Sequence, residues 1–435
     1  MNSAEHEKNQ GRKVLNVPNK REQNQTCLDS AEREGLRPKG NVPNLRFPEF
    51  QGEWEELGLS ELLDFKNGLN PKPDKFGKGI KFISVMDILN NAVITYDCIK
   101  ASVDVTEKEL SDFSVEKGDL LFQRSSETLE DVGRANVYMD DKTAVFGGFV
   151  IRGKKKGEYD PQYFNYLLRS PFARKRIIPM GAGAQHFNIG QEGLSKVKLH
   201  FANIEEQKKI GKMLSLLDER IATQNKIIED LKKLKSAIID YAINSLNTDF
   251  AKFGSLYEMA GEGGTPTTSN ASFYDNGKIP FIKIDDLKQK YLTENKDFIT
   301  ELGLQKSSAW LVPTHSILFS NGATIGEISI TTYPVCTKQG ILGIVPKQNI
   351  DVEFLYYFMS SSYFKKAVSR IVTEGTMKTA YLKDINNILC PIPTKEKQQE
   401  IAKMPSALNS KIDFEQSILK LFCSQKQYLL RQMII

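Results

Sequence analysis

The segment Glu205-Glu-Gln-Lys-Lys-Ile-Gly-Lys-Met213 begins a stretch that runs to about Leu246 without proline and with a single glycine, Gly211. Apolar side chains recur in this stretch at steps of three, four and seven residues, at Leu217, Ile221, Ile228, Leu231 and Ile238. This spacing is typical of a helix that carries a coiled-coil stripe. About forty residues at about 1.5 Å each predict a rod of roughly 60 Å, longer than a small domain needs. Such a helix usually separates two other parts of a protein.

The same segment occurs a second time, as Glu396-Lys-Gln-Gln-Glu-Ile-Ala-Lys-Met404, a shift of 396 − 205 = 191 residues. This shift also relates Asp160–Ser170 to Asp351–Ser361. Upstream, Leu120-Leu-Phe-Gln123 aligns with Ile317-Leu-Phe-Ser320 after small insertions. The chain is therefore predicted to be a tandem duplication, in which a globular unit followed by a long helix occurs twice. Two units are too few for a solenoid, so a pseudo-two-fold arrangement is favoured.

The predicted fold is α+β, with two similar mixed α/β domains separated by two long helices that pack as an antiparallel coiled coil. The expected order is a disordered polar tail at 1–40, a domain at 41–202, a helix at 203–248, a domain at 249–393 and a helix at 394–435. Asn203 and Thr394 occupy the N-cap positions of the two helices. Pro405 lacks the amide hydrogen that a helix interior uses, so we expect a kink or a restart there.

Polar residues interrupt both helical stripes and suggest how the helices pair. They are Gln224 and Lys235 in the first helix and Glu415 and Lys426 in the second. A parallel pairing in the repeat register would set Lys235 against Lys426. An antiparallel pairing can set Lys235 beside Glu415 and Gln224 beside Lys426, with apolar residues in the remaining layers, and we predict this register because buried polar residues select it. The alternative is that these polar side chains are exposed on a looser stripe.

Composition sets few limits on function. The 435 residues include 59 Lys+Arg and 54 Asp+Glu, and the resulting charge of +5 permits nucleic-acid binding without arguing for it. The five isolated cysteines predict free thiols in a reducing compartment, not a disulfide framework or a zinc site. No apolar run approaches the roughly 18 residues of a membrane span, and the N-terminus does not resemble a signal peptide. We therefore expect a cytoplasmic protein.

Known catalytic motifs are not apparent. The span Gly148–Lys155 resembles a phosphate-binding P-loop, but Lys155 stands where Mg²⁺ binding needs a Ser or Thr hydroxyl. The four histidines lack metal-ligand spacing. The segment Ser170-Pro171-Phe172 lacks the second proline of an Asn-Pro-Pro-Tyr-like motif for amino methylation. We therefore expect that this chain has no catalytic residue and no metal site and binds no cofactor itself.

Binding surfaces rich in basic and aromatic residues remain. Arg152–Arg176 holds eight basic residues against two acidic ones, and Tyr363–Lys383 holds five against one. Such cations suit DNA phosphates, although an ordinary solvated helix face is the alternative for each residue. The loops 123–134 and 321–327 follow matched strands and carry Gln, Arg and Asn, which read base edges. The loops 183–188 and 375–381 also correspond. The candidate DNA-binding residues are Gln123, Arg124, Arg134, Lys154, Lys155, Arg174, Lys175, Arg176, Gln185, His186, Asn321, Lys338, Gln339, Lys365, Lys366, Arg370, Lys378 and Thr379.

The order of motifs resembles the DNA specificity subunit of Type I restriction-modification systems. The resemblance rests on Asn44-Leu-Arg-Phe-Pro-Glu-Phe-x-Gly-x-Trp54, Gly118-Asp-Leu-Leu-Phe122, Asp160–Pro171 and the helix openings at 205–210 and 397–401. It implies that each domain is a target-recognition domain that reads one half of a bipartite DNA site. It implies also that the helices act as a ruler for the spacer between the halves.

The resemblance assigns catalysis to partner subunits. Two modification subunits would methylate adenine with S-adenosylmethionine, and restriction subunits would use ATP and Mg²⁺ for translocation and cleavage. This chain would then be non-catalytic. Two alternatives stay open: a stand-alone DNA-modifying enzyme with an unrecognised catalytic site, and a protein-interaction scaffold without a role on DNA.

Overall fold

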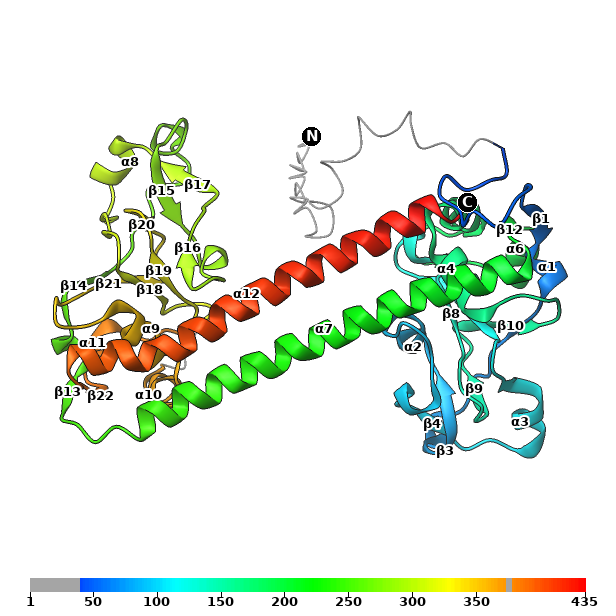
Figure 1. Cartoon of the computed structure of the whole chain (residues 1–435), viewed down its shortest axis with the longest axis horizontal. Helices are drawn as coiled ribbons and strands as arrows, with labels where there is room; N and C mark the ends of the chain where they lie inside the picture. Colours follow the sequence, from blue (N-terminus) through cyan, green and yellow to red (C-terminus); the bar gives the residue numbers. More distant parts are fainter. Residues whose placement is uncertain (1–39, 373–377) are drawn as a thin grey trace, which may run out of the picture. The chain divides into compact units, whose positions relative to one another are not determined.

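The computed structural model of the chain describes residues 40–372 and 378–435 (Figure 1). The polar tail predicted at residues 1–40 thus lies, apart from Gly40, outside the described residues. The chain divides into a first unit, made of residues up to Ile221 together with Leu421–Ile435, and a second unit, Ala222–Lys420. Each unit contains a mixed α/β domain and a part of each long helix. No helix in the described ranges is long and apolar enough to cross a membrane.

The domain of the first unit is built on two four-stranded sheets. One is antiparallel, in the order β2 (Leu63–Asn67), β10 (Val150–Lys155), β6 (Leu120–Gln123) and β8 (Ala135–Val137). The other has the order β4 (Ser102–Val103), β3 (Phe76–Ile83), β9 (Ala144–Phe146) and β5 (Ser114–Val115), and its β3–β9 pair is parallel. Two short antiparallel pairs join β1 (Glu55–Gly58) to β12 (Lys198–Phe201) and β7 (Ser125–Ser126) to β11 (Phe187–Asn188). The domain's helices are α1 (Leu59–Leu62), α2 (Val85–Asn90), α3 (Glu107–Phe113), α4 (Pro161–Arg169), α5 (Pro171–Ile177) and α6 (Gln191–Ser195).

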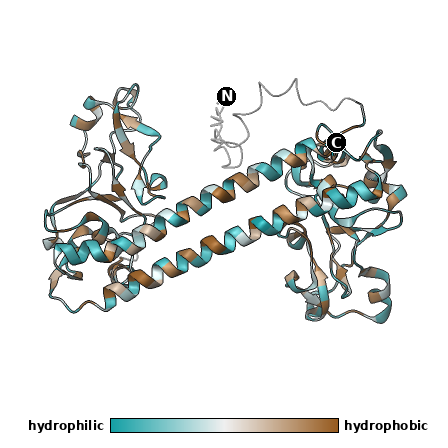
Figure 2. Cartoon of the chain, viewed as in Figure 1, coloured by the Kyte–Doolittle hydropathy of each residue, from teal (hydrophilic) through white to brown (hydrophobic). Residues whose placement is uncertain are grey.

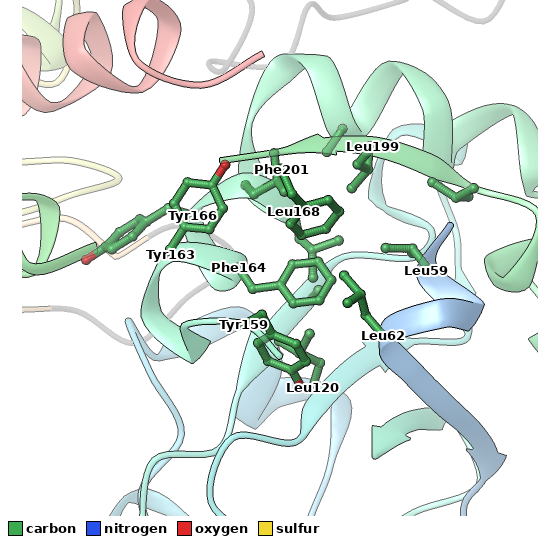
Figure 3. Close-up of a cluster of buried hydrophobic side chains, with 14 of the residues drawn as sticks. Leu59, Leu62, Leu120, Tyr159, Tyr163, Phe164, Tyr166, Leu168, Leu199 and Phe201 are labelled. Atoms are coloured by element: carbon green, nitrogen blue, oxygen red, sulfur yellow. The ribbon is translucent and has the colours of Figure 1, made fainter. Parts of the chain in front are cut away.

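The α4 helix centres the main core of this domain. Asp160 caps it by accepting a hydrogen bond from the backbone N–H of Tyr163, and Pro161 occupies the first helical position, where no amide hydrogen is needed. Figure 3 shows its aromatic side chains among leucines from β6, β12 and α1. The rings of Phe164 and Tyr159 meet edge-on, with centroids 4.7 Å apart. Burial of large side chains along one helix therefore joins the helix to the sheet.

The domain of the second unit repeats this plan with a larger sheet. Five strands have the order β14 (Tyr257–Glu262), β21 (Ile341–Pro346), β18 (Ile317–Ser320), β19 (Ile328–Thr331) and β16 (Tyr291–Leu292). Three more have the order β17 (Asp297–Ile299), β15 (Ile279–Ile282) and β20 (Cys336–Thr337), and β13 (Phe250–Lys252) pairs with β22 (Leu389–Pro391). The helices are α8 (Glu301–Gln305), α9 (Val352–Ser360), α10 (Ser362–Ile371) and α11 (Leu382–Ile385).

The duplication predicted from the sequence is confirmed by matching contacts in the two units. In the first unit, the Gln207 side chain accepts a hydrogen bond of 3.0 Å from the backbone N–H of Asp160. In the second, Gln398 accepts one of 2.8 Å from Asp351, and both pairs are related by the shift of 191. Each glutamine also donates to a backbone carbonyl just before its long helix, at 2.8 and 2.9 Å. The start of each long helix is thus joined to its domain in the same way.

The two long helices are α7 (Ile204–Asn244), with 41 residues, and α12 (Lys395–Gln432), with 38. They appear in green and in orange to red in Figure 1. The Asn203 side chain caps α7 by accepting from the backbone N–H of Glu206 at 2.9 Å. Pro405 lies inside α12, which runs through it unbroken, so the predicted restart is wrong.

Within each unit the helices pack antiparallel, as predicted. In the first unit Asp218 pairs with Lys426, and the Arg220 guanidinium lies 5.2 Å from the Phe422 ring centroid. Residue numbers therefore rise along α7 while those of its partners on α12 fall. The same is true in the second unit, where Gln224 contacts Glu415 and Lys235 contacts a residue nearer the start of α12.

The predicted pairs Lys235–Glu415 and Gln224–Lys426 are wrong. The Gln224 amide instead donates to the Glu415 backbone carbonyl at 3.1 Å and to its carboxylate. Lys235 lies eleven residues further along α7, about 16 Å away along the helix axis. Gln224 and Glu415 are both buried, which also excludes the alternative that these two are merely exposed.

The polar partners that set the register come from positions outside the apolar stripe. Lys235 donates to Asn409 at 2.9 Å, and Lys426 donates to Asp218. The two contacts are copies of each other under the shift of 191. Asp218 is itself held by its domain, because it accepts a hydrogen bond of 2.6 Å from the Tyr166 hydroxyl. Apolar periodicity alone allows several registers, and these long-range contacts choose one.

Candidate nucleic-acid interface

Three loops of the first unit meet where β6 ends. The backbone carbonyl of Arg124 accepts a hydrogen bond of 2.9 Å from the N–H of Ile189, and its N–H donates to the carbonyl of Phe149 at 2.9 Å. These two bonds place the segment 124–126 between the turn 147–149 and the segment 182–188. We call these three segments the first loop cluster. Three segments far apart in the sequence thus form one surface.

Polar and aromatic side chains cover this cluster. Gln185 and His186 are exposed, and the Ser125 hydroxyl donates to the side chain of Asn188. The Phe149 ring is 68% exposed, which is unusual for a phenylalanine in an ordered turn. The Arg124 guanidinium donates to the carbonyl of Gly148 at 3.3 Å and so lies beside that turn. The cluster therefore offers hydrogen-bonding groups and one apolar ring to a partner.

The turn that carries Phe149 depends on two glycines. A Cβ on Gly148 would lie 1.9 Å from the Asn70 side-chain oxygen, and one on Gly147 would lie 2.7 Å from the Phe82 ring. Contacts this short do not occur between real atoms, so larger residues would displace the turn or its neighbours. The Asn70 and Phe82 side chains therefore occupy the space that a side chain at Gly148 or Gly147 would need.

The second unit has the same arrangement at the end of β18. The Asn321 carbonyl accepts from the N–H of Ala380 at 2.8 Å, and its N–H donates to the carbonyl of Gly340 at 3.0 Å. Ala380 and Gly340 correspond to Ile189 and Phe149 under the shift of 191. The described segments 321–322, 338–340 and 378–379 form the second loop cluster. The predicted loop at 375–381 lies partly outside the described residues.

The predicted residues of the second cluster fall into an exposed and a buried group. Lys338, Gln339 and Lys378 are exposed, while Thr379 is half-buried and forms a β-bridge with Gly322. Asn321 is only 1% exposed, and its amide donates to the carbonyl of Ala380 at 3.3 Å. Asn321 therefore braces the cluster, and the lysines and Gln339 are free to contact a partner.

Gln123 has the corresponding internal position in the first unit. It is 5% exposed and donates to the carbonyl of Ser125 at 2.9 Å. Arg134 is exposed, but its guanidinium forms an ion pair of 2.6 Å with Asp131. Neither side chain points freely from the surface, so both are placed to shape the loop 123–134.

Some basic residues of α5 form hydrogen bonds within the domain, and others are exposed to solvent. The Arg174 guanidinium donates to the carbonyls of Glu130 and Val132 at 2.8 and 2.6 Å, and burial lowers its pKa to about 10. Arg176 donates to the carbonyl of Lys198 at 2.6 Å. Lys175 is exposed. Arg176 is exposed as well, so Lys175 and Arg176 are open to solvent, whereas Arg174 holds the loop that follows β6.

Lys154 and Lys155 lie away from the first loop cluster. They end β10, whose first residue Val150 follows the Phe149 turn, so about 15 Å of extended strand lies between. Lys154 pairs with Glu116 at 3.5 Å, and Lys155 donates to the carbonyl of Tyr159 at 3.0 Å. The structure does not bring these lysines together with the loops.

The basic residues of α10 form an exposed row in the second unit. Lys365, Lys366 and Arg370 are all exposed on this helix. Lys365 also borders a cavity of about 460 Å³ together with Lys378 of the second loop cluster. These cations can therefore reach a polyanion that contacts the second loop cluster.

Sequence reasoning missed Phe149, Ser125 and Asn188. Two adjacent glycines directly before an aromatic residue were the available signal for Phe149. Ser125 and Asn188 carry no motif, and only the pairing of β7 with β11 brings them together.

The P-loop-like span does not have the backbone of a P-loop. Val150–Lys155 is the strand β10, paired on both sides with β2 and β6, whereas a P-loop is a turn before a helix. Within the described ranges, no group of three or more His, Cys, Asp or Glu side chains is placed to hold a metal ion.

Comparison with known proteins gives consistent results. A family model described as the Type I restriction modification DNA specificity domain matches residues 51–233 and again 247–421. A Methanocaldococcus jannaschii protein named as the MjaX type I restriction enzyme specificity subunit is 25% identical over 399 residues, which cover 86% of this chain and 91% of that protein. The S subunit of the Type I system of M. genitalium has a similar fold, with a TM-score of 0.56, 18% identity, and coverage of 91% of this chain and 99% of that one. A chain from a structure titled for complex assembly and conformational transition of the type I R-M system also has a TM-score of 0.56, at 14% identity, covering 87% of this chain and 96% of that chain.

Proposed function

Because this chain belongs to the Type I restriction-modification DNA specificity family, we propose that it binds one bipartite DNA site and reads one half with each domain. The observation that carries the proposal is the loop cluster that occurs twice, once per domain, with matching backbone hydrogen bonds at Arg124 and Asn321. Two copies of one reading surface suit two half-sites. Their side chains differ, so the two half-sites would differ in sequence.

The chemistry of the clusters supports base reading beside phosphate contact. Glutamine side chains, such as Gln185 and Gln339, can both donate to and accept from the edges of bases in the major groove. Exposed cations of the second cluster, Lys338 and Lys378, suit phosphates, whose contacts position a protein on the duplex without reading sequence. The combination is therefore that of a DNA-reading surface.

We propose further that the chain is non-catalytic and directs partner subunits. Adenine methylation would use S-adenosylmethionine on two modification subunits, and restriction subunits would use ATP and Mg²⁺. The outer surface of the long helices is the proposed docking region. Exposed apolar side chains recur there every seven residues, as Ile227, Leu234 and Tyr241 on α7 and as Phe414, Leu421 and Tyr428 on α12. Figure 2 shows apolar residues along both helices.

The test is methylome sequencing of cells that express this chain with a modification subunit from the same system. We expect methylated adenines within one motif that has two defined halves and an undefined spacer. Gln185→Ala combined with His186→Ala should change or relax one half and leave the other intact. The control, Lys338→Ala combined with Gln339→Ala, should affect the opposite half.

Two results would contradict the proposal. Absence of any methylated motif, with the complex shown to assemble, would argue against DNA recognition by this chain. Methyl transfer by the purified chain alone, given DNA and S-adenosylmethionine, would show that it is an enzyme in its own right.

A further inference from the structure

A cavity of about 580 Å³ in the second unit is lined by an excess of positive charge. It lies between α7, α12 and the segment that leads into β16. Five lysines line it: Lys232, Lys235, Lys288, Lys290 and Lys420. One carboxylate, that of Asp413, is among the lining residues. The volume lies within the range of small-molecule sites.

Two of the five lysines have acidic partners nearby. Lys290 is 5% exposed, and its ammonium group lies 2.8 Å from the Glu353 carboxylate. Lys288 pairs with Asp285 at 3.4 Å. Within residues 40–372 and 378–435, no ion pair joins a carboxylate to any of the other three, which are Lys232, Lys235 and Lys420.

Lys235 is the most buried of these three lysines, since Lys232 and Lys420 are exposed. Its ammonium donates to the neutral amide oxygen of Asn409 at 2.9 Å, and the Asn409 amide donates in turn to Asp413 at 3.0 Å. Burial lowers the pKa of Lys235, the Asp413 carboxylate opposes this effect, and the neighbouring ammonium groups of Lys232, Lys290 and Lys365 lower it further. The protein thus holds like charges together at a cost in free energy that a bound anion would offset.

The repeat shows that this charge excess is peculiar to the second copy. Under the shift of 191, Lys235 corresponds to Lys426 and Asn409 corresponds to Asp218. In the first unit the lysine is neutralised, because Lys426 pairs directly with the Asp218 carboxylate. The duplicated framework therefore accepts a carboxylate at this position, and the second copy has an amide instead.

At two other positions that line the cavity, the second copy also has a more positive residue than the first. Lys420 corresponds to Glu229, and Lys232 corresponds to Cys423. These three differences make the second copy more positive, whereas Asp413 and Ser417, which correspond to Ala222 and Lys226, make it less positive. Over the helix positions that line the cavity, the second copy still carries two more positive charges than the first. Neutral hydrogen-bonding groups of Gln289, Gln416 and Ser417 complete the lining.

We propose that this cavity binds a phosphate group, supplied either by the backbone of duplex DNA or by a free phosphate-bearing ligand. A backbone phosphodiester carries one negative charge and a phosphate monoester up to two, and both have several acceptor oxygens, which match separate lysines and amide donors around one space. The inference is independent of base recognition, since it concerns residues outside both loop clusters.

The test is calorimetric titration of the full-length chain with pyrophosphate, with ionic strength held constant by sodium chloride. We expect saturable binding by the natural chain. Asn409→Asp supplies the carboxylate that the first unit has, so it should weaken pyrophosphate binding by about tenfold. Lys232→Gln combined with Lys420→Gln, at two exposed positions, should weaken it similarly. Asp218→Asn, the reverse change in the first unit, is the matched control and should leave the affinity unchanged.

A second titration identifies the source of the phosphate. The site holds the DNA backbone if two results are found. Random-sequence duplex DNA should displace pyrophosphate, and in the Lys232→Gln/Lys420→Gln variant the slope of log affinity for DNA against log salt concentration should be smaller in magnitude by about two. If duplex DNA does not displace pyrophosphate, then the ligand is a free phosphate compound. The proposal is overturned if pyrophosphate does not bind, or if it binds equally to the natural chain and the Asn409→Asp variant.

Discussion

The Asp218 carboxylate in the first unit gives a sharp test of how a long helix is joined to its domain. It accepts a hydrogen bond of 2.6 Å from the Tyr166 hydroxyl and pairs with Lys426. Tyr166 is buried, and burial together with the Asp218 carboxylate raises the pKa of its phenol, which therefore stays protonated and donates. Asp218→Ala would leave this buried hydroxyl and the Lys426 ammonium without their acceptor.

The structure sets the expected size of the effect. A hydrogen bond to a charged group contributes about 1.5–3 kcal/mol to stability. The ion pair adds less, because its side chains are 23% and 22% exposed and water screens them. We therefore expect Asp218→Ala to lower the free energy of unfolding of the first unit by about 2–3 kcal/mol. Tyr166→Phe removes the hydrogen bond but keeps the ion pair, so it should cost about 1–2 kcal/mol.

The assay uses the two tryptophans of the chain, of which Trp54 lies in the core of the first unit and Trp310 in the second unit. In a Trp310→Phe background, Trp54 fluorescence reports urea unfolding of the first unit alone. With a denaturant slope of about 2 kcal/mol per molar, Asp218→Ala should lower the midpoint by about 1 M. The control is Asp230→Ala, at an exposed position of α7, which should shift the midpoint only slightly.

The double variant decides whether the two side chains act together. Asp218→Ala and Tyr166→Phe remove the same hydrogen bond, so their effects should be less than additive by about 1 kcal/mol or more. The reasoning is refuted if the two effects add fully, or if Asp218→Ala behaves like Asp230→Ala.

Three further predictions concern the loops, the buried lysine and the helices. Gly148→Ala should weaken recognition of one half-site about tenfold, because its Cβ would collide with the Asn70 side chain. Gly190→Ala is the control and should leave recognition unchanged, because the space around Gly190 is open. Filter binding to DNA that carries the methylated motif measures the affinity of both variants. Lys235→Met should stabilise the second unit by about 1 kcal/mol at neutral pH. Since folding lowers the pKa of Lys235, the destabilisation caused by this lysine should shrink as the pH rises toward the ordinary pKa of lysine. Urea unfolding of the natural chain and of Lys235→Met, at pH 7 and at pH 10, measures this change. Deleting one helical turn, about 5.4 Å, from facing positions of α7 and α12 should change the length of the DNA spacer by one to two base pairs and leave both half-sites unaltered. Methylome sequencing measures the motif, and altered half-sites would contradict the role of the helices as a ruler.

The sequence by itself determined the repeated framework of this protein. A shift of 191 residues, repeated capped helix starts and long runs of helical periodicity are local or periodic properties, so they can be found without any tertiary contact. The antiparallel sense of the helix pair also followed, because a parallel pair would have placed Lys235 against Lys426. The resemblance of the motifs to DNA specificity subunits then indicated the family.

Only the tertiary structure decided the helix register and the reading surface. The register depends on Asp218, held by Tyr166 from another part of the chain, and on Asn409, whereas an apolar stripe fits several registers about equally well. The loop clusters depend on backbone hydrogen bonds such as that from Ile189 to Arg124, which join segments more than sixty residues apart. Such contacts leave no periodic trace in the sequence, because they are made by backbone groups that every residue carries.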